Sequence, residues 1–439
     1  MQNRINRRGF FEVSAQKIVS MVEGGWGIET AAAADLPSGD DLVVTIFLRG
    51  ACDALSFISP LSGKDRDAYE SGRPTIRIEK EGVAASLKLD DRFGLHPSAK
   101  ELYALYQKQK LDVVCAAGLT ADTRSHFDAQ AFMEFGTPGK KNSHTGWLTR
   151  YLEAQSRAPR SSAPLSPLTT GRIVIPAVSV GTLMPTSLLS FGNAVVINSL
   201  SGFNLARYKN FQDDQLAALG ALYSGQGWID PYAHQTLSAI RTFSNFKEDE
   251  EVLAQRATYP KSDLAGKLKT LAELLRMELG IRVANVDMGG WDTHKQQGAG
   301  TEGTFHNQVQ QLSQAIDAFY TDLEKNSPSL LGRLTLVVMT EFGRRLKENA
   351  NRGTDHGHGA FMLVLGEKIK GGQVFGEWPG LETAKLYERA DLAVVTDYRS
   401  VLSEVLLGSL SAVKARGVFP DFKPGAKLGL LKPRVVSSS

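Results

Sequence analysis

The segment Gly353–Met362 (GTDHGHGAFM) concentrates metal-binding side chains between glycines. The chain of 439 residues holds 8 histidines, and two of them, His356 and His358, stand here beside Asp355. An apolar run, Ala360–Leu365, follows directly and is typical of a buried strand. Imidazole nitrogens and carboxylate oxygens bind divalent cations, so the segment predicts a metal site at the mouth of a strand. A solvated loop is the alternative interpretation.

A second cluster, Asp287–His294 (DMGGWDTH), follows the apolar run Ile281–Val286. Asp287, Asp292 and His294 are candidate metal ligands, and the paired glycines let the backbone turn between them. The alternative is a simple turn, in which Asp292 makes a local hydrogen bond to the backbone and His294 faces solvent.

Single carboxylates follow two further apolar runs. Asp53 comes after the run DLVVTIFLR, and Glu341 comes after the run LTLVVM. Both positions suit a metal ligand at the end of a strand. Asp53 could equally cap the next helix. Glu341 could instead form an ion pair with Arg344 or Arg345.

The segment around Ser125 combines a helix start with groups that bind anions. Ser125 and Asp128 match a loosened capping box, so Ser125 is predicted to cap a helix that reaches Phe135. A helix N-terminus also gathers unpaired N–H groups, which favour a bound anion or a developing oxyanion. Ser125 is therefore also a candidate nucleophile. Arg124 and His126 beside it are a candidate anion clamp and a candidate ligand.

These clusters need a common scaffold, and the alternation of apolar runs with segments of helical spacing predicts one. The predicted strands are Asp41–Arg49, Leu111–Ala117, Ile281–Val286, Leu334–Met339 and Phe361–Leu365. The predicted helices are His96–Gln107, Ser125–Phe135, Ser262–Leu279, His306–Leu323 and Leu392–Leu407. Strands that are apolar on both faces and separated by helices predict a doubly wound, mostly parallel α/β sheet with helices on both faces. Ligands of such sheets bind at the carboxyl ends of the strands, so the polar turns are expected to converge there.

The middle of the chain has a different character. Residues 156–170 are rich in Ser, Pro and Arg and predict a loop, and only weak strand and helix patterns follow. We therefore expect an inserted cap region at about residues 156–250 of an α/β domain that spans residues 35–439.

The N-terminus has the form of an export signal. Asn6–Phe11 (NRRGFF) matches a twin-arginine motif, and Ala31–Ala34 supplies small residues suited to cleavage. Residues 1–34 are thus predicted to direct export by the twin-arginine machinery to the periplasm or the medium. Charged residues interrupt the stretch between the two motifs, so an amphipathic N-terminal helix of a cytoplasmic protein is the alternative.

Composition excludes two classes of partner. The 50 basic and 47 acidic residues give a net charge of +3 with no basic patch, which argues against a nucleic-acid partner. No run of apolar residues is long enough for a membrane span. Cys52 and Cys115 are expected to be buried thiols, and a disulfide between them is possible only if their strands are neighbours.

Several motifs together resemble the DUF1501 family: LRGACDALSF, RSHFDAQAFME, GGWDTH, TEFGR, and GTDHGHG followed by GGQVFGEWPGL. The family is grouped with the alkaline phosphatase/sulfatase superfamily, and the resemblance spans nearly the whole mature chain. It implies an alkaline phosphatase-like domain with metal ligands at strand ends and a nucleophile at a helix start, where Ser125 stands. The metal ligands implied by position are Asp53, Asp287 or Asp292, His294, Glu341, Asp355, His356 and His358.

The chain departs from the superfamily pattern in two places. It lacks the C/S-x-P-x-R motif of sulfatases, which disfavours formylglycine chemistry. Glu341 and Phe342 replace an Asp-His pair, which removes one histidine ligand. A centre with one metal ion is therefore as plausible as a two-metal hydrolytic site.

Together these features predict an exported, metal-dependent hydrolase of phosphate or sulfate esters, or of a related small anionic or polysaccharide substrate. Its cofactor would be one or two divalent ions such as Zn, Mn or Ca. The alternative is a non-catalytic protein that retains the fold and binds an envelope or polysaccharide partner.

Overall fold

The computed structural model describes residues 41–155, 174–407 and 417–433, apart from residues 201, 204, 206–210, 226, 228 and 247. The predicted export signal, residues 1–34, and the predicted loop at residues 156–170 lie outside this part of the chain.

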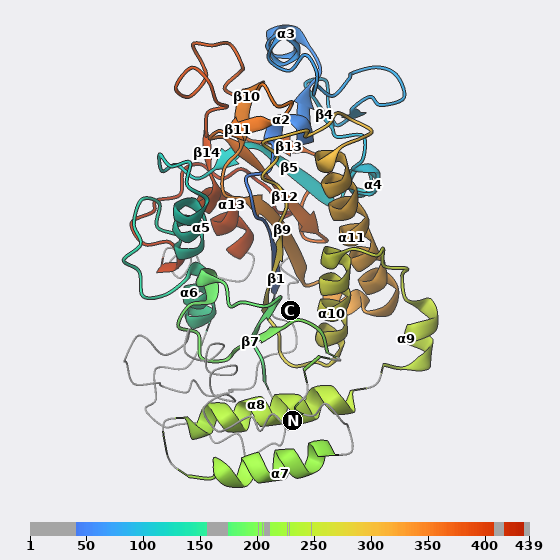
Figure 1. Cartoon of the computed structure of the whole chain (residues 1–439), viewed down its shortest axis with the longest axis vertical. Coiled ribbons are helices and arrows are strands. Elements are labelled where there is room, and N and C mark those ends of the chain that lie inside the picture. The colour runs from blue at the N-terminus through green and yellow to red at the C-terminus, as the bar shows by residue number, and fades with distance from the viewer. Residues whose placement is uncertain are drawn as a thin grey trace, which may run out of the picture.

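A nine-stranded sheet forms the centre of the molecule, with the strand order β13-β5-β12-β9-β1-β8-β6-β7 and with β14 paired to β5 (Figure 1). The strands are β1 (Leu42–Leu48), β5 (Leu111–Gly118), β6 (Ala177–Val180), β7 (Ala194–Ile197), β8 (Val283–Met288), β9 (Leu334–Thr340), β12 (Ala360–Gly366), β13 (Val374–Phe375) and β14 (Thr396–Asp397). The five predicted strands are confirmed as β1, β5, β8, β9 and β12. The sheet is mixed but mostly parallel, since β12 alone among these five is antiparallel to its neighbours, β5 and β9.

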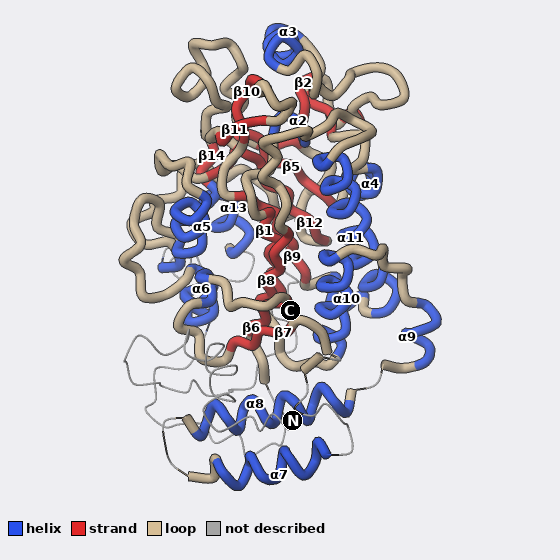
Figure 2. Tube along the Cα trace, viewed as in Figure 1, coloured by secondary structure: helices blue, strands red, loops and turns tan. Residues whose placement is uncertain are grey.

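Helices cover both faces of the sheet, as predicted (Figure 2). They are α4 (Lys100–Gln107), α10 (Asp263–Arg276) and α11 (Thr304–Asn326) on one face, and α5 (His126–Phe135), α6 (Trp147–Gln155) and α13 (Tyr398–Leu406) on the other. All seven residues of β1 are buried, because alternate side chains enter the two apolar cores. Val44 and Ile46 pack with α10 and α11, whereas Val43 and Phe47 pack with α6 and α13.

Helix ends follow the capping chemistry of the sequence. The Ser262 hydroxyl accepts a hydrogen bond from Ala265 N at 3.2 Å and starts α10. The prediction for the last helix was wrong in its start, because α13 begins at Tyr398, with Asp397 as its cap, and not at residue 392.

Smaller elements surround this core. Near the carboxyl ends of the central strands lie α2 (Ala54–Phe57), α3 (Gly63–Gly72), β2 (Ile58–Pro60), β3 (Leu87–Lys88), β4 (Phe93–Leu95), and the pair β10 (Arg344–Glu348) and β11 (Thr354–His356). Elsewhere lie η1 (Thr186–Leu188), α7 (Gln212–Leu222), α8 (Asp230–Asn245), α9 (Glu250–Gln255) and α12 (Pro328–Leu331). None of the described helices is both long enough and apolar enough to cross a membrane.

The region predicted as an insertion contributes β6 and β7, which extend the sheet in parallel beyond β8. Helices α7 and α8 lie beyond these strands, at the end of the molecule opposite α3 (Figure 1). They share a small apolar cluster of Leu216, Leu237 and Ile240. The boundaries of a separate cap region stay a prediction.

The direction of β12 decides where its preceding loop lies. If β12 were parallel to β9, its first residue would lie at the amino-terminal edge of the sheet. Because β12 is antiparallel, Ala360 pairs with Ala117 near the carboxyl end of β5. The turn that carries His356 and His358 therefore joins the polar turns after β1, β8 and β9. Cys52 and Cys115 are both buried and free.

Candidate metal centre

Three histidines from separate loops converge at this edge of the sheet. His126 is the first residue of α5, His294 follows β8, and His356 ends β11. The Nε2 atom of His356 lies 3.0 Å from Nε2 of His126 and 2.9 Å from Nε2 of His294. Asp292 completes the group, since its Oδ1 lies 3.2 Å from His356 Nε2 and 3.0 Å from His294 Nε2.

Each imidazole turns its Nδ1 atom toward a group that can only accept a hydrogen bond. The three pairs are His126 with Glu341 Oε1 at 2.9 Å, His294 with Asp355 Oδ1 at 3.2 Å, and His356 with the Arg124 carbonyl oxygen at 2.9 Å. The proton of each neutral ring is therefore assigned to Nδ1, and the lone pair to Nε2. Lone pairs that face one another at about 3 Å repel. A cation bound between them would be attracted to all of these lone pairs and would remove the repulsion.

The donor set fits a single divalent cation. Metal-ligating histidines commonly donate their second N–H to a carboxylate or a carbonyl, which is the arrangement of all three rings. Three nitrogens and one carboxylate oxygen match a tetrahedral zinc site, in which bonds of about 2.0–2.1 Å place the ligand atoms roughly 3.3 Å apart. Among the described residues, His126, Asp292 and His356 are the group whose ligand atoms all lie within 4.8 Å of one another, and His294 extends it.

The surroundings set the protonation of the candidate ligands: they favour metal-ready forms of His356 and Asp292 but a proton on His126. Burial lowers the pKa of His356, and the nearby charge of Arg344 adds to this effect, so the ring is neutral at pH 7. Burial alone would raise the pKa of Asp292, but the hydrogen bond and the charge of Arg344, together with His294 and His356, outweigh burial and hold the pKa below its usual value. The hydrogen bond to Glu341 raises the pKa of His126.

Glu341 lies behind His126 at the end of β9. It is fully buried, and its Oε1 also accepts hydrogen bonds from Gly50 N at 2.8 Å and Gln130 Nε2 at 2.9 Å. Burial would raise the pKa of Glu341, but the hydrogen bonds to His126 and Gln130 outweigh it and lower the pKa. Glu341 therefore orients the ring of His126. It forms no ion pair with Arg344 or Arg345.

Arg344 is a site residue that the sequence patterns did not single out. Its buried guanidinium donates to Asp292 Oδ1 at 2.5 Å. Its other acceptors are the backbone oxygens of Gly50, Ala51, Trp291 and Thr354. One side chain thus holds together the loops that follow β1, β8 and β10. The signal in the sequence was its place directly after Glu341-Phe342-Gly343 at a strand end.

The family model for DUF1501, described as a protein of unknown function, matches residues 40–406. The chain belongs to the DUF1501 family. No curated protein matches this DUF1501 sequence.

Solved structures that match this DUF1501 chain do so at low similarity. The C-terminal periplasmic domain of EcEptC from Escherichia coli, in complex with Zn, has 10% identity and a TM-score of 0.33, with 75% of this chain and 74% of that chain covered. Ps i-CgsB in complex with k-i-k-neocarrahexaose has 10% identity and a TM-score of 0.36, with 86% and 74% covered. The alkaline phosphatase from the Antarctic bacterium TAB5 has 9% identity and a TM-score of 0.26, with 74% and 92% covered. The α/β assignment of this DUF1501 chain follows from its own strand order.

Asp53 lies in a separate buried cluster. Its carboxylate accepts two hydrogen bonds from Arg73, at 2.5 and 2.9 Å, and one from Gln297 Nε2 at 2.6 Å. Burial would raise the pKa of Asp53, but the charge of Arg73 lowers it. The carbonyl oxygen of the same Gln297 amide accepts from the hydroxyls of Thr293 and Thr354, each at 2.8 Å. Asp53 therefore anchors, from behind, the two loops that carry His294 and His356 in this DUF1501 chain.

The remaining predicted residues surround the centre in different ways. Asp287 pairs with Arg49 and its side chain is 41% exposed. The His358 ring is buried and stacks on Tyr387 at 4.0 Å between centroids, and burial lowers its pKa. The geometry therefore brings His126, Asp292, His294 and His356 together, with Glu341 and Asp355 behind them. It places Asp53, Asp287 and His358 in other contacts.

The start of α5 confirms the capping role of Ser125, whose hydroxyl accepts a hydrogen bond from Asp128 N at 3.3 Å. The Arg124 side chain pairs with Glu388 and Asp391, each at 2.6 Å. The side chain of Phe127, the residue after His126, is 86% exposed.

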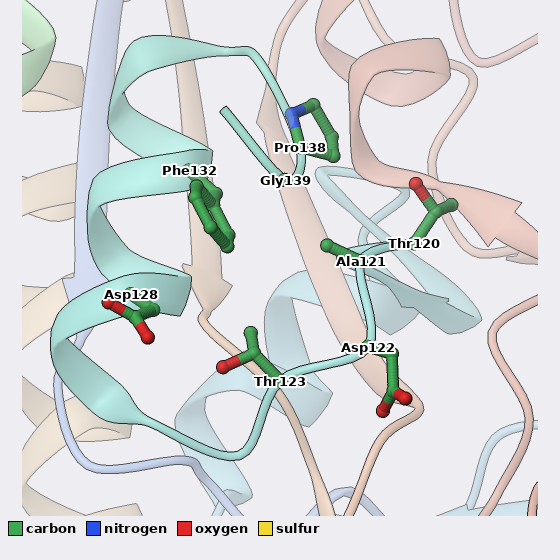
Figure 3. Close-up of a pocket in the computed structure, with 8 residues that line it drawn as sticks. All are labelled: Thr120, Ala121, Asp122, Thr123, Asp128, Phe132, Pro138 and Gly139. Atoms are coloured by element: carbon green, nitrogen blue, oxygen red, sulfur yellow. The ribbon is translucent and has the colours of Figure 1, made fainter. Parts of the chain in front are cut away.

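A hollow of about 490 Å³ adjoins the same helix. Figure 3 shows Asp128 and Phe132 of α5 on one side, and the loop with Thr120, Ala121, Asp122 and Thr123 on the other. Pro138 and Gly139 complete the lining. The charged side chains of this lining are both acidic.

Proposed function

We propose that this chain is an exported, metal-dependent hydrolase of phosphate or sulfate esters, or of a related anionic group. The observation that carries the proposal is the convergence of three Nε2 lone pairs and one carboxylate on a point that no proton donor occupies. Such an arrangement is costly without a cation. A water molecule or a substrate oxygen would join the four protein ligands as a fifth, a coordination number that zinc can adopt during catalysis. A bound divalent ion would lower the pKa of a water molecule and withdraw charge from the ester oxygen.

The chain's own residues prepare the ligands for this task. Glu341 and Asp355 each hold a proton at Nδ1 of one histidine, and the carbonyl of Arg124 holds the third. These contacts keep every Nε2 atom free to bind a cation. Arg344 keeps Asp292 ionised and fixed in direction.

The centre is open to a substrate on one side. The side chains of Asp292 and His294 are 47% and 38% exposed, whereas Glu341 behind them is fully buried. Ser125 precedes His126 at the start of α5, so an anionic group bound at the ion would meet the positive end of that helix. We assign Ser125 to attack or to position the anion at this point, in addition to its capping role.

The test begins with elemental analysis of the purified protein, followed by assays with generic aryl phosphates and aryl sulfates in the presence of Zn, Mn or Ca. We expect a bound ion near one equivalent and ester hydrolysis that disappears in His356→Ala. A variant of the exposed His144, His144→Ala, is the matched control and should keep both. Metal binding without hydrolysis of any ester would favour the non-catalytic binding protein instead, and absence of bound metal would remove the proposal.

Export is a separate part of the proposal and has its own measurement. Mass spectrometry of the mature N-terminus, after expression in a bacterium with a twin-arginine system, should find cleavage near Ala34. Replacement of Arg7 and Arg8 by lysine should leave uncleaved protein in the cytoplasm. An intact N-terminus in the wild type would place the enzyme in the cytoplasm.

A further inference from the structure

A second hollow, of about 450 Å³, lies among residues that follow His294 and precede His356 in the sequence. Its lining consists of Lys295, Gln296, Ala350, Asn351 and Arg352. One wall begins at Lys295, which directly follows the candidate ligand His294. The other wall is the turn between β10 and β11, and β11 ends in His356. The two segments that line the hollow are thus close in sequence to His294 and His356.

The two walls of the hollow are fastened to each other through the backbone. Gln296 N donates to Asn351 O, and Gln297 N donates to Arg352 O, each at 2.9 Å. The Asn349 side chain adds a 3.0 Å hydrogen bond to the carbonyl oxygen of His294. The loops therefore form a fixed frame rather than two independent surface turns.

Two residues of this frame hold unfavourable backbone conformations. Gln296 has φ 45° and Arg352 has φ 55°, in the left-handed region that residues other than glycine rarely adopt. Such strain persists where surrounding contacts impose it, and it is concentrated at ligand-binding sites. Here the left-handed backbone conformation sets the direction in which the side chains of Gln296 and Arg352 extend from the two loops.

The hollow carries positive charge that no described residue neutralises. Lys295 and Arg352 are exposed, and among the described residues neither side chain forms an ion pair or a hydrogen bond. Asp355, on the strand that follows Arg352, is already held by His294 and by Asn349 Nδ2 at 3.0 Å. Two unpaired cations that line the same hollow favour a bound anion.

We propose that this hollow, defined by Lys295, Asn351 and Arg352, binds a second anionic group of the substrate. The inference rests on the proposed function and narrows it. The substrate then carries two phosphate or sulfate groups, one at the metal centre and one between Lys295 and Arg352. The hollow beside α5 has no cation in its lining, and its Asp128 is already paired with Lys141, so it offers such a group no matching contact. We therefore place the second group on the side of residue 295.

The proposal is tested by calorimetric binding of two probes, orthophosphate and pyrophosphate, to the metal-loaded full chain. We expect pyrophosphate to bind at least about tenfold more tightly than orthophosphate. Lys295→Gln and Arg352→Gln should each weaken pyrophosphate binding by about threefold to tenfold, because each removes one charge-assisted contact at an exposed site. Orthophosphate binding should change by less than about twofold.

Lys108→Gln is the matched control, since Lys108 is exposed and precedes β5 at the opposite edge of the sheet. It should leave the affinity for both probes unchanged. An unaltered preference for pyrophosphate in the double variant Lys295→Gln/Arg352→Gln would overturn the inference, because the preference would then come from the ion alone. Equal affinity of the wild type for the two probes would overturn it as well.

The outcomes for the two proposals are distinguishable. If esters are hydrolysed but the preference does not depend on Lys295 and Arg352, only the second anion site is removed. If no ester is hydrolysed but the preference does depend on them, the hollow is an anion-binding site in a protein that is not a hydrolase.

Discussion

Two polar clusters lie at the same edge of the sheet, and they differ in how their groups are paired. The Asp53–Arg73 cluster is buried, and both oxygens of its carboxylate receive hydrogen bonds from a cation or an amide. The histidine cluster is partly exposed, and its Nε2 atoms face one another with no donor between them. The first arrangement is complete without a ligand, whereas the second becomes stable with one.

The difference shows that position at a strand end does not distinguish a ligand from a structural anchor. Asp53 and Asp292 both follow parallel strands, and arginine contacts both carboxylates. Asp53 has every acceptor position directed at Arg73 and its neighbours, while Asp292 also faces three imidazoles. The two roles differ in whether nitrogen or oxygen atoms keep a free lone pair for a metal ion after the protein's own hydrogen bonds are formed.

The largest expected effect comes from removing the cation of the Asp53–Arg73 cluster. Arg73→Met would leave the Asp53 carboxylate buried without its cation, which should lower the free energy of unfolding by about 3–5 kcal/mol in urea titrations. Arg77→Met removes a surface ion pair with Glu79 and should cost less than about 1 kcal/mol.

The same cluster offers a test of ligation. The double variant Asp53→Leu/Arg73→Met should be more stable than Arg73→Met alone and should still bind metal. Loss of metal from a folded double variant would instead make Asp53 a ligand.

The next effect comes from opening the histidine cluster. In wild type, an ion at 100 times its dissociation constant should stabilise the fold by about 2.7 kcal/mol, because it binds only the folded state. His356→Ala should abolish this metal-dependent shift of the melting temperature, since it removes the nitrogen that contacts both other rings. An equal shift in the variant would exclude ligation by His356.

A smaller effect should follow from changing the charge behind the cluster. Glu341→Gln keeps an oxygen that can accept from His126 and Gly50, but it loses the negative charge. We expect metal affinity to fall by about 10-fold to 100-fold, measured by competition with a chelator, because a carboxylate that accepts a hydrogen bond from a ligating histidine raises the basicity of that histidine. Glu348→Gln, on β10 beside Thr75, should leave the affinity as it is.

The smallest expected effect on stability concerns Ser125. Ser125→Ala should cost about 1 kcal/mol through loss of the helix cap, whereas Ser125→Gly should cost only a few tenths. Both variants lack the hydroxyl, so the pair separates capping from chemistry. Equal loss of ester hydrolysis in both would assign Ser125 to the reaction, and activity that survives in Ser125→Gly would limit it to the cap.

The fold could be predicted because its strands carry their own signal. β1, β5 and β9 are mostly apolar and buried at every position, as expected of strands covered on both faces. The direction of β12 could not be predicted, because an apolar run has the same pattern in either orientation. That direction was nevertheless what placed His356 at the correct edge.

The candidate site could be predicted only as a set of residues. The sequence located His294, Asp292 and His356 at loops expected to converge, and the geometry brings them within contact distance. It gave no means of separating Asp53 from them, because the partner of Asp53 is Arg73, in a segment without any motif. Arg344 and Gln297 were missed for the same reason, since their roles depend on loops distant in the chain.

The pairing of β1 has a consequence for how the protein is made. Val43 pairs with Val283 and Leu42 pairs with Leu334, so the first strand has no neighbour until most of the polypeptide has been synthesised. A nascent chain on the ribosome therefore cannot complete the sheet, and His356 emerges later still. Contacts between residues so distant in sequence form slowly. A metal centre that included His356 could therefore form only after most of the chain has left the ribosome. Any chaperone that protects the unfinished protein would meet the exposed β1, in which Thr45 is the one polar residue.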